Sequence, residues 1–275
     1  MKKKKYISPI RIVFYLILIG YAFITLGPFL WSAITSLKPT SAVNNFSVDL
    51  KTLSFKNYIF VFKNYPFLKW TINSIIVAGV VTCGNLLFNS MAGYSLARIN
   101  FPGRNIMFLS VLGMMMIPGQ VVMVPTYILL SKLGWVNTYK GMTLPFLTSL
   151  FGIFLMRQFY LSIPKEVEEA AEVDGLGKFG TFFRIVMPMS KTALTTQFIL
   201  MFTGNWNSFL WPSLLAQSTE MYTLPIGLNS FYGQYFQASD QVMAGVMILS
   251  LPSILIFFIL QRNFVKGITN SGGKE

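Results

Sequence analysis

The sequence WTINSIIVAGVVTCGNLLFNSMAGYSLA, residues 70–97, contains no charged side chain between Lys69 and Arg98. A helix needs about 20 residues to cross the roughly 30 Å hydrocarbon core of a bilayer. Lipid offers no hydrogen-bond partner to the backbone, so a segment of this kind is predicted to be helical. Strands of a membrane barrel alternate in polarity over about ten residues, whereas this stretch is apolar on every side. It is therefore predicted to be one membrane-spanning helix.

The rest of the chain extends this pattern, because 53% of its residues are hydrophobic and 11% are charged. Globular domains average about 25% charged residues. Further uncharged runs cover residues 12–37, 105–131, 192–219 and 241–261, and a shorter one at 141–156 spans if Arg157 snorkels. We predict an all-α integral membrane protein, a single domain over residues 1–275, with six transmembrane helices at about 12–36, 70–96, 106–130, 139–160, 190–216 and 241–261. Pro118 and Pro125 permit a kink in the third span.

The net charge of +13 is explained by topology rather than by nucleic-acid binding. Six spans place both termini on one side. With the N-terminus inside the cell, the inner segments hold 15 of the 22 basic residues, in the direction of the positive-inside rule. We therefore expect a multi-pass protein in the lipid bilayer with both termini cytoplasmic and no nucleic-acid partner. One cysteine, Cys83, and no histidine predict neither a disulfide nor a metal site.

Five of the nine acidic residues lie between Glu166 and Asp174. Proline at 164, glutamates in the first turn and a glycine at 175 predict a short cytoplasmic helix over residues 164–174. A second helix should follow and bend at Pro188 into the fifth span, with an apolar stripe made of Phe179, Phe182, Phe183, Val186 and Met187. An exposed helix with small residues and an acidic rim either docks a basic partner or only keeps this loop solvated.

The spacing of Glu169-Ala170-Ala171, Gly175, Ile185 and Met187-Pro188 resembles the EAA motif of ABC-importer permeases, which usually have leucine where Met187 stands. The similarity continues in PGQ (118–120), IFLMRQFYLSIPKE (153–166), GNWNSFLWP (204–212), YTLPIGL (222–228) and QRNFVKGIT (261–269). Together these stretches resemble the carbohydrate-uptake branch, and within it the six-span subunit of the maltose type. The resemblance implies a type I ABC-importer permease of the bacterial cell membrane, which forms half of the pathway of an ATP-driven sugar importer.

The same resemblance implies the partners and the residues that meet them. The partners would be a second homologous permease, two cytoplasmic ATPase subunits and an extracytoplasmic sugar-binding protein. The EAA loop, residues 164–188, would hold the coupling helix that docks on an ATPase. Its coupling residues would be Glu169 as the contact, Ala170 and Ala171 for close seating, Asp174, and Gly175 for the turn.

Two sequence features separate this chain from the ATPase itself. It has no P-loop, and GLGKFG at 175–180 follows a predicted helix rather than the strand that a dinucleotide site requires. ATP and magnesium would thus be bound by the partner ATPase. This chain is expected to hold no cofactor and to be a pore subunit rather than an enzyme.

The substrate path is predicted from neutral side chains, because no charged residue lies deep in a span and ion-coupled carriers usually need one. Asn205, Trp206, Asn207 and Ser208 either contact an uncharged polyol or hold helices together, and the same alternatives apply to Asn73, Asn85 and Gln197. The aromatic loop at 222–236 is expected, by resemblance, to contact the binding protein through Tyr222, Phe231, Tyr232 and Tyr235. The alternative is an interfacial aromatic belt.

Two other functions stay open at this point. An ATP-independent secondary carrier or channel for a small polar solute would respond to an ion gradient without an ATPase. A membrane scaffold would leave sugar uptake unaffected when deleted. Within the carbohydrate branch, an oligosaccharide, a monosaccharide and a glycerol phosphate all fit.

Overall fold

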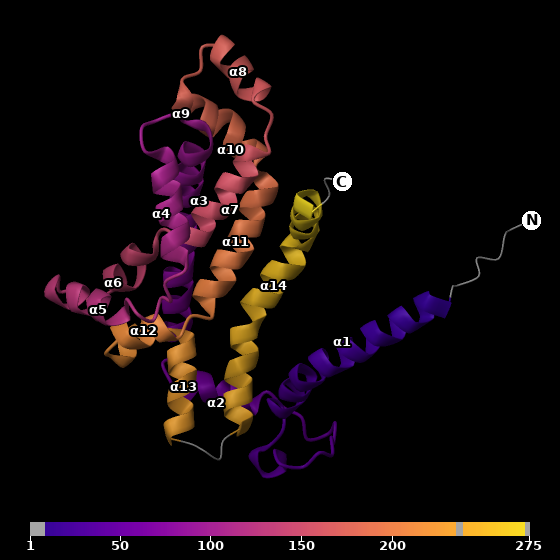
Figure 1. The fold of residues 1–275 in the computed structure, drawn as a ribbon. Helices are drawn as coiled ribbons and strands as arrows, with labels where there is room; N and C mark the ends of the chain where they lie inside the picture. Colours follow the sequence, from indigo (N-terminus) through magenta and orange to yellow (C-terminus); the bar gives the residue numbers. More distant parts are fainter. Residues whose placement is uncertain (1–8, 235–238, 273–275) are drawn as a thin grey trace, which may run out of the picture. The chain divides into compact units, whose positions relative to one another are not determined.

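The computed structural model describes residues 9–234 and 239–272, with side chains described for 10–231 and 239–261, and every regular element in these ranges is a helix (Figure 1). The α-helices are α1 (Pro9–Thr35), α2 (Lys56–Asn64), α3 (Phe67–Arg98), α4 (Arg104–Met115), α5 (Met123–Lys132), α6 (Tyr139–Thr143), α7 (Leu150–Leu161), α8 (Glu166–Val173), α9 (Lys178–Thr181), α10 (Met187–Met189), α11 (Lys191–Trp206), α12 (Leu210–Leu215), α13 (Leu224–Gln234) and α14 (Ser239–Gly272). Short 3-10 turns cover Thr40–Ala42 (η1), Leu144–Phe146 (η2) and Thr219–Met221 (η4), and a π-helix covers Phe182–Val186 (η3).

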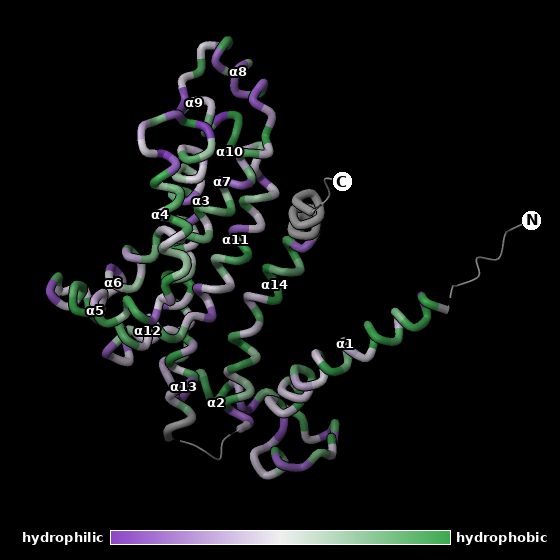
Figure 2. The backbone as a smooth tube through the Cα atoms, in the orientation of Figure 1, coloured by the Kyte–Doolittle hydropathy of each residue, from purple (hydrophilic) through white to green (hydrophobic). Residues whose placement is uncertain are grey.

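Within the described residues, four helical segments are long and apolar enough to cross a membrane. They are Ile10–Thr35, Phe67–Arg98, Tyr139–Leu161 and Ser239–Gln261. A fifth candidate is a bent pair, Lys178–Met189 with Lys191–Trp206, whose axes differ by 77°. Apolar residues dominate α1 and the described part of α14, whereas α8 is largely hydrophilic (Figure 2). The prediction of an all-α membrane protein is confirmed.

The third and fifth predicted spans are broken rather than continuous. Residues 106–130 fall into α4, which has only 12 residues, and α5, with Met116–Val122 between them. Pro118 has no N–H to continue a helical ladder, and it stands in this break. The fifth span, predicted at 190–216, is α11 followed by α12, and residues 207–209 between them are not helical.

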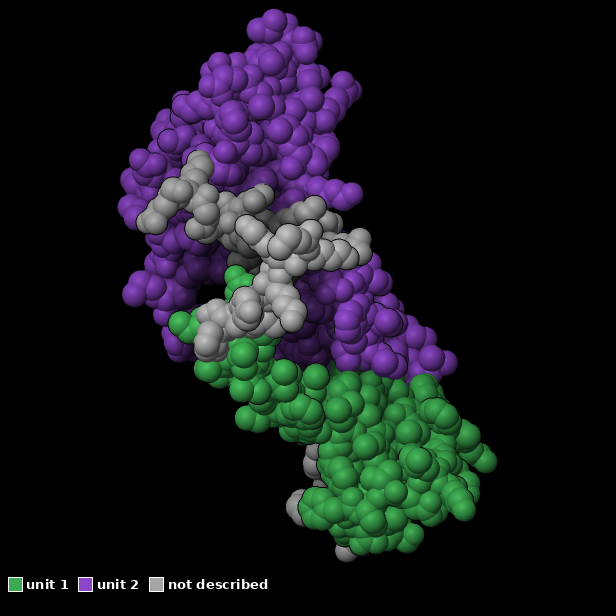
Figure 3. Space-filling view, turned by 90° about the vertical axis from the view of Figure 1, so that its right-hand side faces the viewer, with its two compact units in different colours: residues 1–65, 228–250 green, residues 66–227, 251–275 purple. Residues whose placement is uncertain are grey.

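The chain folds as two compact units, coloured separately in Figure 3. Unit 1 contains residues 1–65 and 228–250, and unit 2 contains residues 66–227 and 251–275. In unit 1 the buried amide of Asn57 on α2 donates to the carbonyls of Ser36 and Lys38, at 2.9 and 2.8 Å. Thr40 donates to the buried carboxylate of Asp240, at 2.7 Å. These bonds attach α2 and the start of α14 to the segment that follows α1.

Unit 2 is built on α3, which packs lengthwise against α7 and α11 (Figure 1). Glycine makes the contact close: an added Cβ on Gly93 would lie 2.8 Å from the Cβ of Met156 and 2.9 Å from the backbone nitrogen of Arg157. An added Cβ on Gly152 would lie 2.1 Å from the amide nitrogen of Asn89. Lipid tails are as apolar as the helices, so close backbone approach is a main source of attraction between helices in a membrane.

Buried amides also join α3 to α11 and to the segments around η2 and η4. Asn85 on α3 donates to the carbonyl of Phe146 at 2.8 Å, and Gln197 on α11 donates to the carbonyl of Asn85 at 3.1 Å. Asn73 donates to the carbonyls of Glu220 and Tyr222, both at 2.8 Å. For these three amides, the interpretation as contacts between segments of the chain is therefore confirmed.

Candidate coupling and transport sites

The acidic segment forms α8, an eight-residue helix about 12 Å long. It is shorter than the predicted 164–174, because Lys165 serves as the N-cap and Asp174 as the C-cap. Its first turn carries three glutamates, which suits the positive end of the helix dipole. At the other end Gly175 has φ +81°, and Leu176 donates its N–H to the carbonyl of Ala171 at 2.9 Å. This is a Schellman cap, which needs a left-handed residue at the position of Gly175.

The two faces of α8 have different surroundings. Glu169 and Ala170 are exposed, as are Asp174 and Gly175 in the turn that follows. Ala171 is only 4% exposed and faces its own chain. Four of the five residues predicted to meet the ATPase thus lie on the surface, and Ala171 does not. The reason is helical phase, since Ala171 lies three residues beyond the buried Glu168 and shares its face.

The buried face of α8 carries an ion pair. The Oε1 atom of Glu168 lies 2.9 Å from Nε of Arg98, the last residue of α3. The hydroxyl of Tyr94, one turn earlier on α3, donates to Oε2 of Glu168 at 3.1 Å. Arg98 also donates through Nη2 to the carbonyl of Ile163, in the link between α7 and α8. Both charged side chains are almost fully buried, at 7% exposure for Arg98 and 11% for Glu168.

The prediction of an exposed acidic rim, whether for docking or for solvation, is wrong for Glu168, which is buried. Glu172 also has a partner, the exposed Lys178 at the start of α9. The signal for the buried pair is weak in the sequence, because Arg98 lies 168 − 98 = 70 positions earlier. Four acids of the segment are thus exposed: Glu166, Glu169, Glu172 and Asp174.

The predicted apolar stripe after α8 is split between two faces. Phe182 and Val186 are buried, whereas Phe179 is 73% exposed and Phe183 is 43% exposed. Thr181, which is not one of the predicted stripe residues, is buried. The π-helix at Phe182–Val186 is the physical reason, because its wider turn takes more residues than an α-helix and shifts the phase of the side chains. The bend expected near Pro188 is present at Ser190, between α10 and α11.

The four predicted substrate-path residues lie at the break between α11 and α12: Asn205 and Trp206 end α11, and Asn207 and Ser208 lie in the break. Asn207 is exposed, and its side-chain amide donates to the carbonyl of Thr203 at 2.9 Å. Asn205 and Ser208 are half-buried. Trp206 is buried, and its ring stacks on Phe202 with centroids 5.9 Å apart. The break thus presents Asn207 outward and keeps Trp206 within the fold.

The predicted aromatic loop is largely the helix α13. Phe231 is 2% exposed, and its ring centroid lies 4.2 Å from that of Tyr65. A contact with the binding protein through Phe231 is therefore not supported, because the ring packs inside the chain. Tyr222 is half-buried. The side chain of Tyr232 and the whole of Tyr235 lie outside the described residues.

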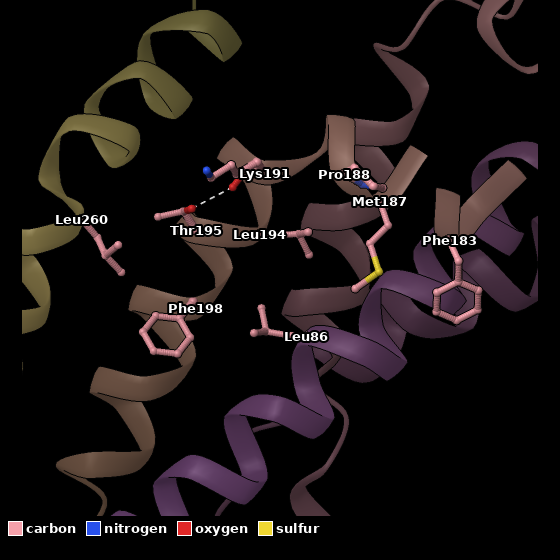
Figure 4. Close-up of a pocket in the computed structure, with 9 residues that line it drawn as sticks. All are labelled: Leu86, Phe183, Met187, Pro188, Lys191, Leu194, Thr195, Phe198 and Leu260. Carbon is pink, nitrogen blue, oxygen red and sulfur yellow. Dashed lines mark hydrogen bonds between the residues drawn. The ribbon is translucent and has the colours of Figure 1, made fainter. Parts of the chain in front are cut away.

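An apolar groove of about 670 Å³ lies in unit 2 (Figure 4). It is lined by Leu86, Phe183, Met187, Pro188, Lys191, Leu194, Thr195, Phe198 and Leu260. The hydroxyl of Thr195 already donates to the carbonyl of Lys191, at 2.7 Å. A sugar site needs several converging polar groups, and this groove offers almost none. Nor do the described residues contain a cluster of three or more potential metal ligands.

Residues 89–270, which include α8 and the break at 207–209, match the family described as the inner membrane component of binding-protein-dependent transport systems. The chain belongs to this family. It is therefore the membrane permease subunit of a transport system, not an enzyme.

Three relatives of this permease have named transport systems. The arabinooligosaccharides transport system permease protein AraQ of Bacillus subtilis (strain 168) is 38% identical, over 97% of each chain. The lactose transport system permease protein LacG of Rhizobium radiobacter is 33% identical, over 94% of this chain and 95% of LacG. The sn-glycerol-3-phosphate transport system permease protein UgpE of Pectobacterium atrosepticum is 34% identical, over 75% of this chain and 74% of UgpE.

The fold of the permease also matches a solved structure. A chain of a bacterial ABC transporter that imports the acidic polysaccharide alginate superposes with a TM-score of 0.81 at 22% identity. The match covers 96% of this chain and 99% of the other. This agreement identifies the fold as that of an ABC-importer permease.

Proposed function

We propose that this permease imports a carbohydrate or a related polyol, driven by ATP bound with magnesium on two partner ATPase subunits. The relatives named above transport arabinooligosaccharides, lactose and glycerol 3-phosphate, which share a hydroxyl-rich skeleton. A second homologous permease would complete the pathway, and an extracytoplasmic binding protein would deliver the substrate. A neighbouring fold has been solved in complex with its periplasmic substrate-binding protein, which supports such a partner.

The observation that carries this proposal is the outward face of α8. Glu169, Ala170, Asp174 and Gly175 form an exposed surface with carboxylates at its edge. Val173, beside them, is 88% exposed. An apolar side chain next to an acidic rim suits a protein partner, in which the charges orient a basic surface and the small residue allows close approach. This surface is the docking site for an ATPase.

The orientation in the membrane follows from that docking. The ATPase is cytoplasmic, so the loop that holds α8 faces the cytoplasm, and so do both termini. The excess of Lys and Arg on the same side supports this orientation. Tyr222, Tyr232 and Tyr235 then belong to the outer side, where the binding protein docks.

The substrate passes the break between α11 and α12. Broken helices at membrane depth are tolerated where they line a cavity, and in transporters they often mark the substrate path. Asn207 is the exposed polar group there, with Asn205 and Ser208 half-buried beside it. Neutral amides and a hydroxyl suit the hydroxyl groups of a sugar. Trp206 supports the wall from inside.

Alternating access links the two sites. ATP binding favours one arrangement of the ATPase pair, which moves α8 and turns the helices outward as rigid bodies. ATP can shift this equilibrium only by its differential affinity for the two states. A change from 1:99 to 99:1 requires about 5.5 kcal/mol, which the binding of two nucleotides can supply.

The test is a charge reversal on the docking surface, Glu169→Lys. We expect the variant to lose most of its association with the ATPase subunits in pull-down assays, and sugar uptake to fall at least tenfold. Asp49→Lys is the matched control, because it makes the same charge change at another exposed carboxylate and should leave both readouts unchanged. Normal association and uptake in Glu169→Lys would count against the proposal. Uptake driven by an ion gradient without an ATPase would favour a secondary carrier instead.

A further inference from the structure

Glu168 and Glu169 are adjacent, yet they lie in opposite environments. Glu169 is exposed on the docking surface, whereas Glu168 is buried and contacts two residues of α3. One carboxylate oxygen of Glu168 is held by Arg98 and the other by Tyr94. The acidic rim described above therefore does not include this residue.

The guanidinium of Arg98 joins three parts of the chain. It ends α3, it pairs with Glu168 in the first turn of α8, and it donates to the carbonyl of Ile163 in the link from α7. A guanidinium is planar, with several donors in fixed directions, so it can hold two acceptors at a set angle. A helix attached only through its two flanking links, residues 162–165 and 174–177, would be able to pivot. With Arg98 in place, α8 is fixed to the end of α3 as well.

The attachment continues into the apolar layer of unit 2. The ring of Tyr94 lies 5.0 Å from that of Phe182 in the π-helix and 5.7 Å from that of Tyr160 on α7, centroid to centroid. These rings belong to one buried cluster with Met156 and Val186. The residue that holds Glu168 is thus packed against the segment that leads into α11. The ion pair, the Tyr94 hydrogen bond and this cluster thus form one connected set of contacts from α8 to α3, α7 and the π-helix.

We propose that Arg98, Glu168 and Tyr94 form a joint that makes α8 and the α3–α7–α11 bundle move as one body, and that these are positioning residues for coupling. The proposal rests on the proposed function, because the joint affects transport only if an ATPase docks on α8 and moves it. Docking of the ATPase depends on the outward face of α8, whereas conversion of docking into transport depends on this joint. Loosening the joint should leave the ATPase bound and hydrolysing ATP while transport fails.

The ion pair Glu172–Lys178 provides a matched comparison. It lies at the end of the same helix, but its side chains are 47% and 55% exposed. An exposed pair of this kind has little effect on structure, whereas a buried charge that loses its partner is strongly unfavourable. Glu172→Gln removes the same charge as Glu168→Gln by the same chemistry. Comparing the two variants therefore distinguishes the effect of losing the buried ion pair from the effect of losing one negative charge in the loop.

The experiment uses the complete transporter in proteoliposomes, with its ATPase subunits and binding protein. Three quantities are measured: ATPase co-purification, ATP hydrolysis stimulated by the binding protein, and sugar taken up per ATP hydrolysed. For Glu168→Gln we expect co-purification within twofold of wild type and a fall of at least tenfold in sugar per ATP. Glu172→Gln should match wild type in all three, and Arg98→Lys should lie between, because an ammonium keeps the charge but lacks the planar, fixed donors of a guanidinium.

A second variant tests the joint in case Glu168→Gln does not fold. Arg98→Met combined with Glu168→Leu replaces the buried pair by apolar side chains, a change that is often neutral or stabilising for folding. It should show the same loss of sugar per ATP. An unchanged ratio in an assembled variant overturns the joint while leaving the proposed function intact. Loss of co-purification in both variants, each of them folded, also overturns it, since Glu168 would then belong to the docking surface. A wild-type complex with no ATP-dependent uptake refutes the proposed function, and with it the joint.

Discussion

Gly175 has a backbone conformation that only glycine adopts readily. Its φ of +81° closes the Schellman cap of α8, and a side chain in the left-handed region costs about 1–2 kcal/mol. Gly177, two positions later, has φ −72°, and an added Cβ there would meet nothing within 4 Å. The two glycines are therefore opposite cases, although they are neighbours in the sequence.

Gly175→Ala should destabilise the end of α8, and Gly177→Ala should not. We expect faster amide hydrogen exchange at residues 171–176 in Gly175→Ala, by roughly five- to thirtyfold for a cost of about 1–2 kcal/mol. The measurement is hydrogen exchange followed by mass spectrometry in detergent. Equal exchange rates in the two variants would contradict the role assigned to the left-handed turn.

At this scale the sequence predicted some residues and not others. The exposed positions of Glu169 and Gly175 agree with the motif spacing, because the helix and its end were readable locally. The inward turn of Glu168 was not predicted, since a string of glutamates does not reveal which one faces a distant arginine. Phe231 was predicted to contact the binding protein, but its ring is buried. Its aromatic ring suits a surface contact and a packed interior equally well.

Among the elements, the contact of α3 with α7 depends on close approach at Gly93. There is no room at this site for a methyl group, because the nearest atoms include the backbone of Arg157, which cannot rotate away. Gly79 on the same helix has nothing within 4 Å of an added Cβ. One helix thus contains a glycine required for packing and one that packing does not require.

Gly93→Ala should lower the stability of the permease by about 1–3 kcal/mol, the usual effect of overpacking. Gly79→Ala should be neutral or slightly stabilising, because alanine is the better helix former. Thermal unfolding in a single detergent, with the two variants side by side, measures the difference. A melting temperature for Gly93→Ala equal to that of Gly79→Ala would contradict the close packing described here.

Uninterrupted uncharged runs were a sound guide to α1, α3 and α14, because length and hydropathy are enough to specify a helix in lipid. The uncharged runs did not predict where a helix is interrupted. The breaks at Met116–Val122 and at residues 207–209 lie inside apolar runs, where hydropathy does not change. The π-helix at Phe182–Val186 was also missed, because an assumed period of 3.6 residues puts Phe179 and Phe183 on the buried stripe.

For the whole molecule, the prediction that matters most is the side of the membrane that α8 faces. Cys83 is the single cysteine, so Cys83→Ser gives a background for single-cysteine labelling. In that background Ala170→Cys should react with a membrane-impermeant maleimide only from the cytoplasmic side. Gln217→Cys, between α12 and η4, should react only from outside, and both native residues are exposed. Labelling of the two cysteines from the same side would contradict the orientation.

The amides that fasten α3 to its neighbours also say something about how the chain is made. Asn85 finds the carbonyl of Phe146 only 61 residues later, and the amide of Gln197 arrives 112 residues later. During synthesis α3 therefore emerges from the ribosome before these partners exist, and the amide of Asn85 has at first only the carbonyl of Val81 in its own helix, at 2.8 Å. The contacts that join α3 to η2 and α11 can form only once those later segments have been synthesised.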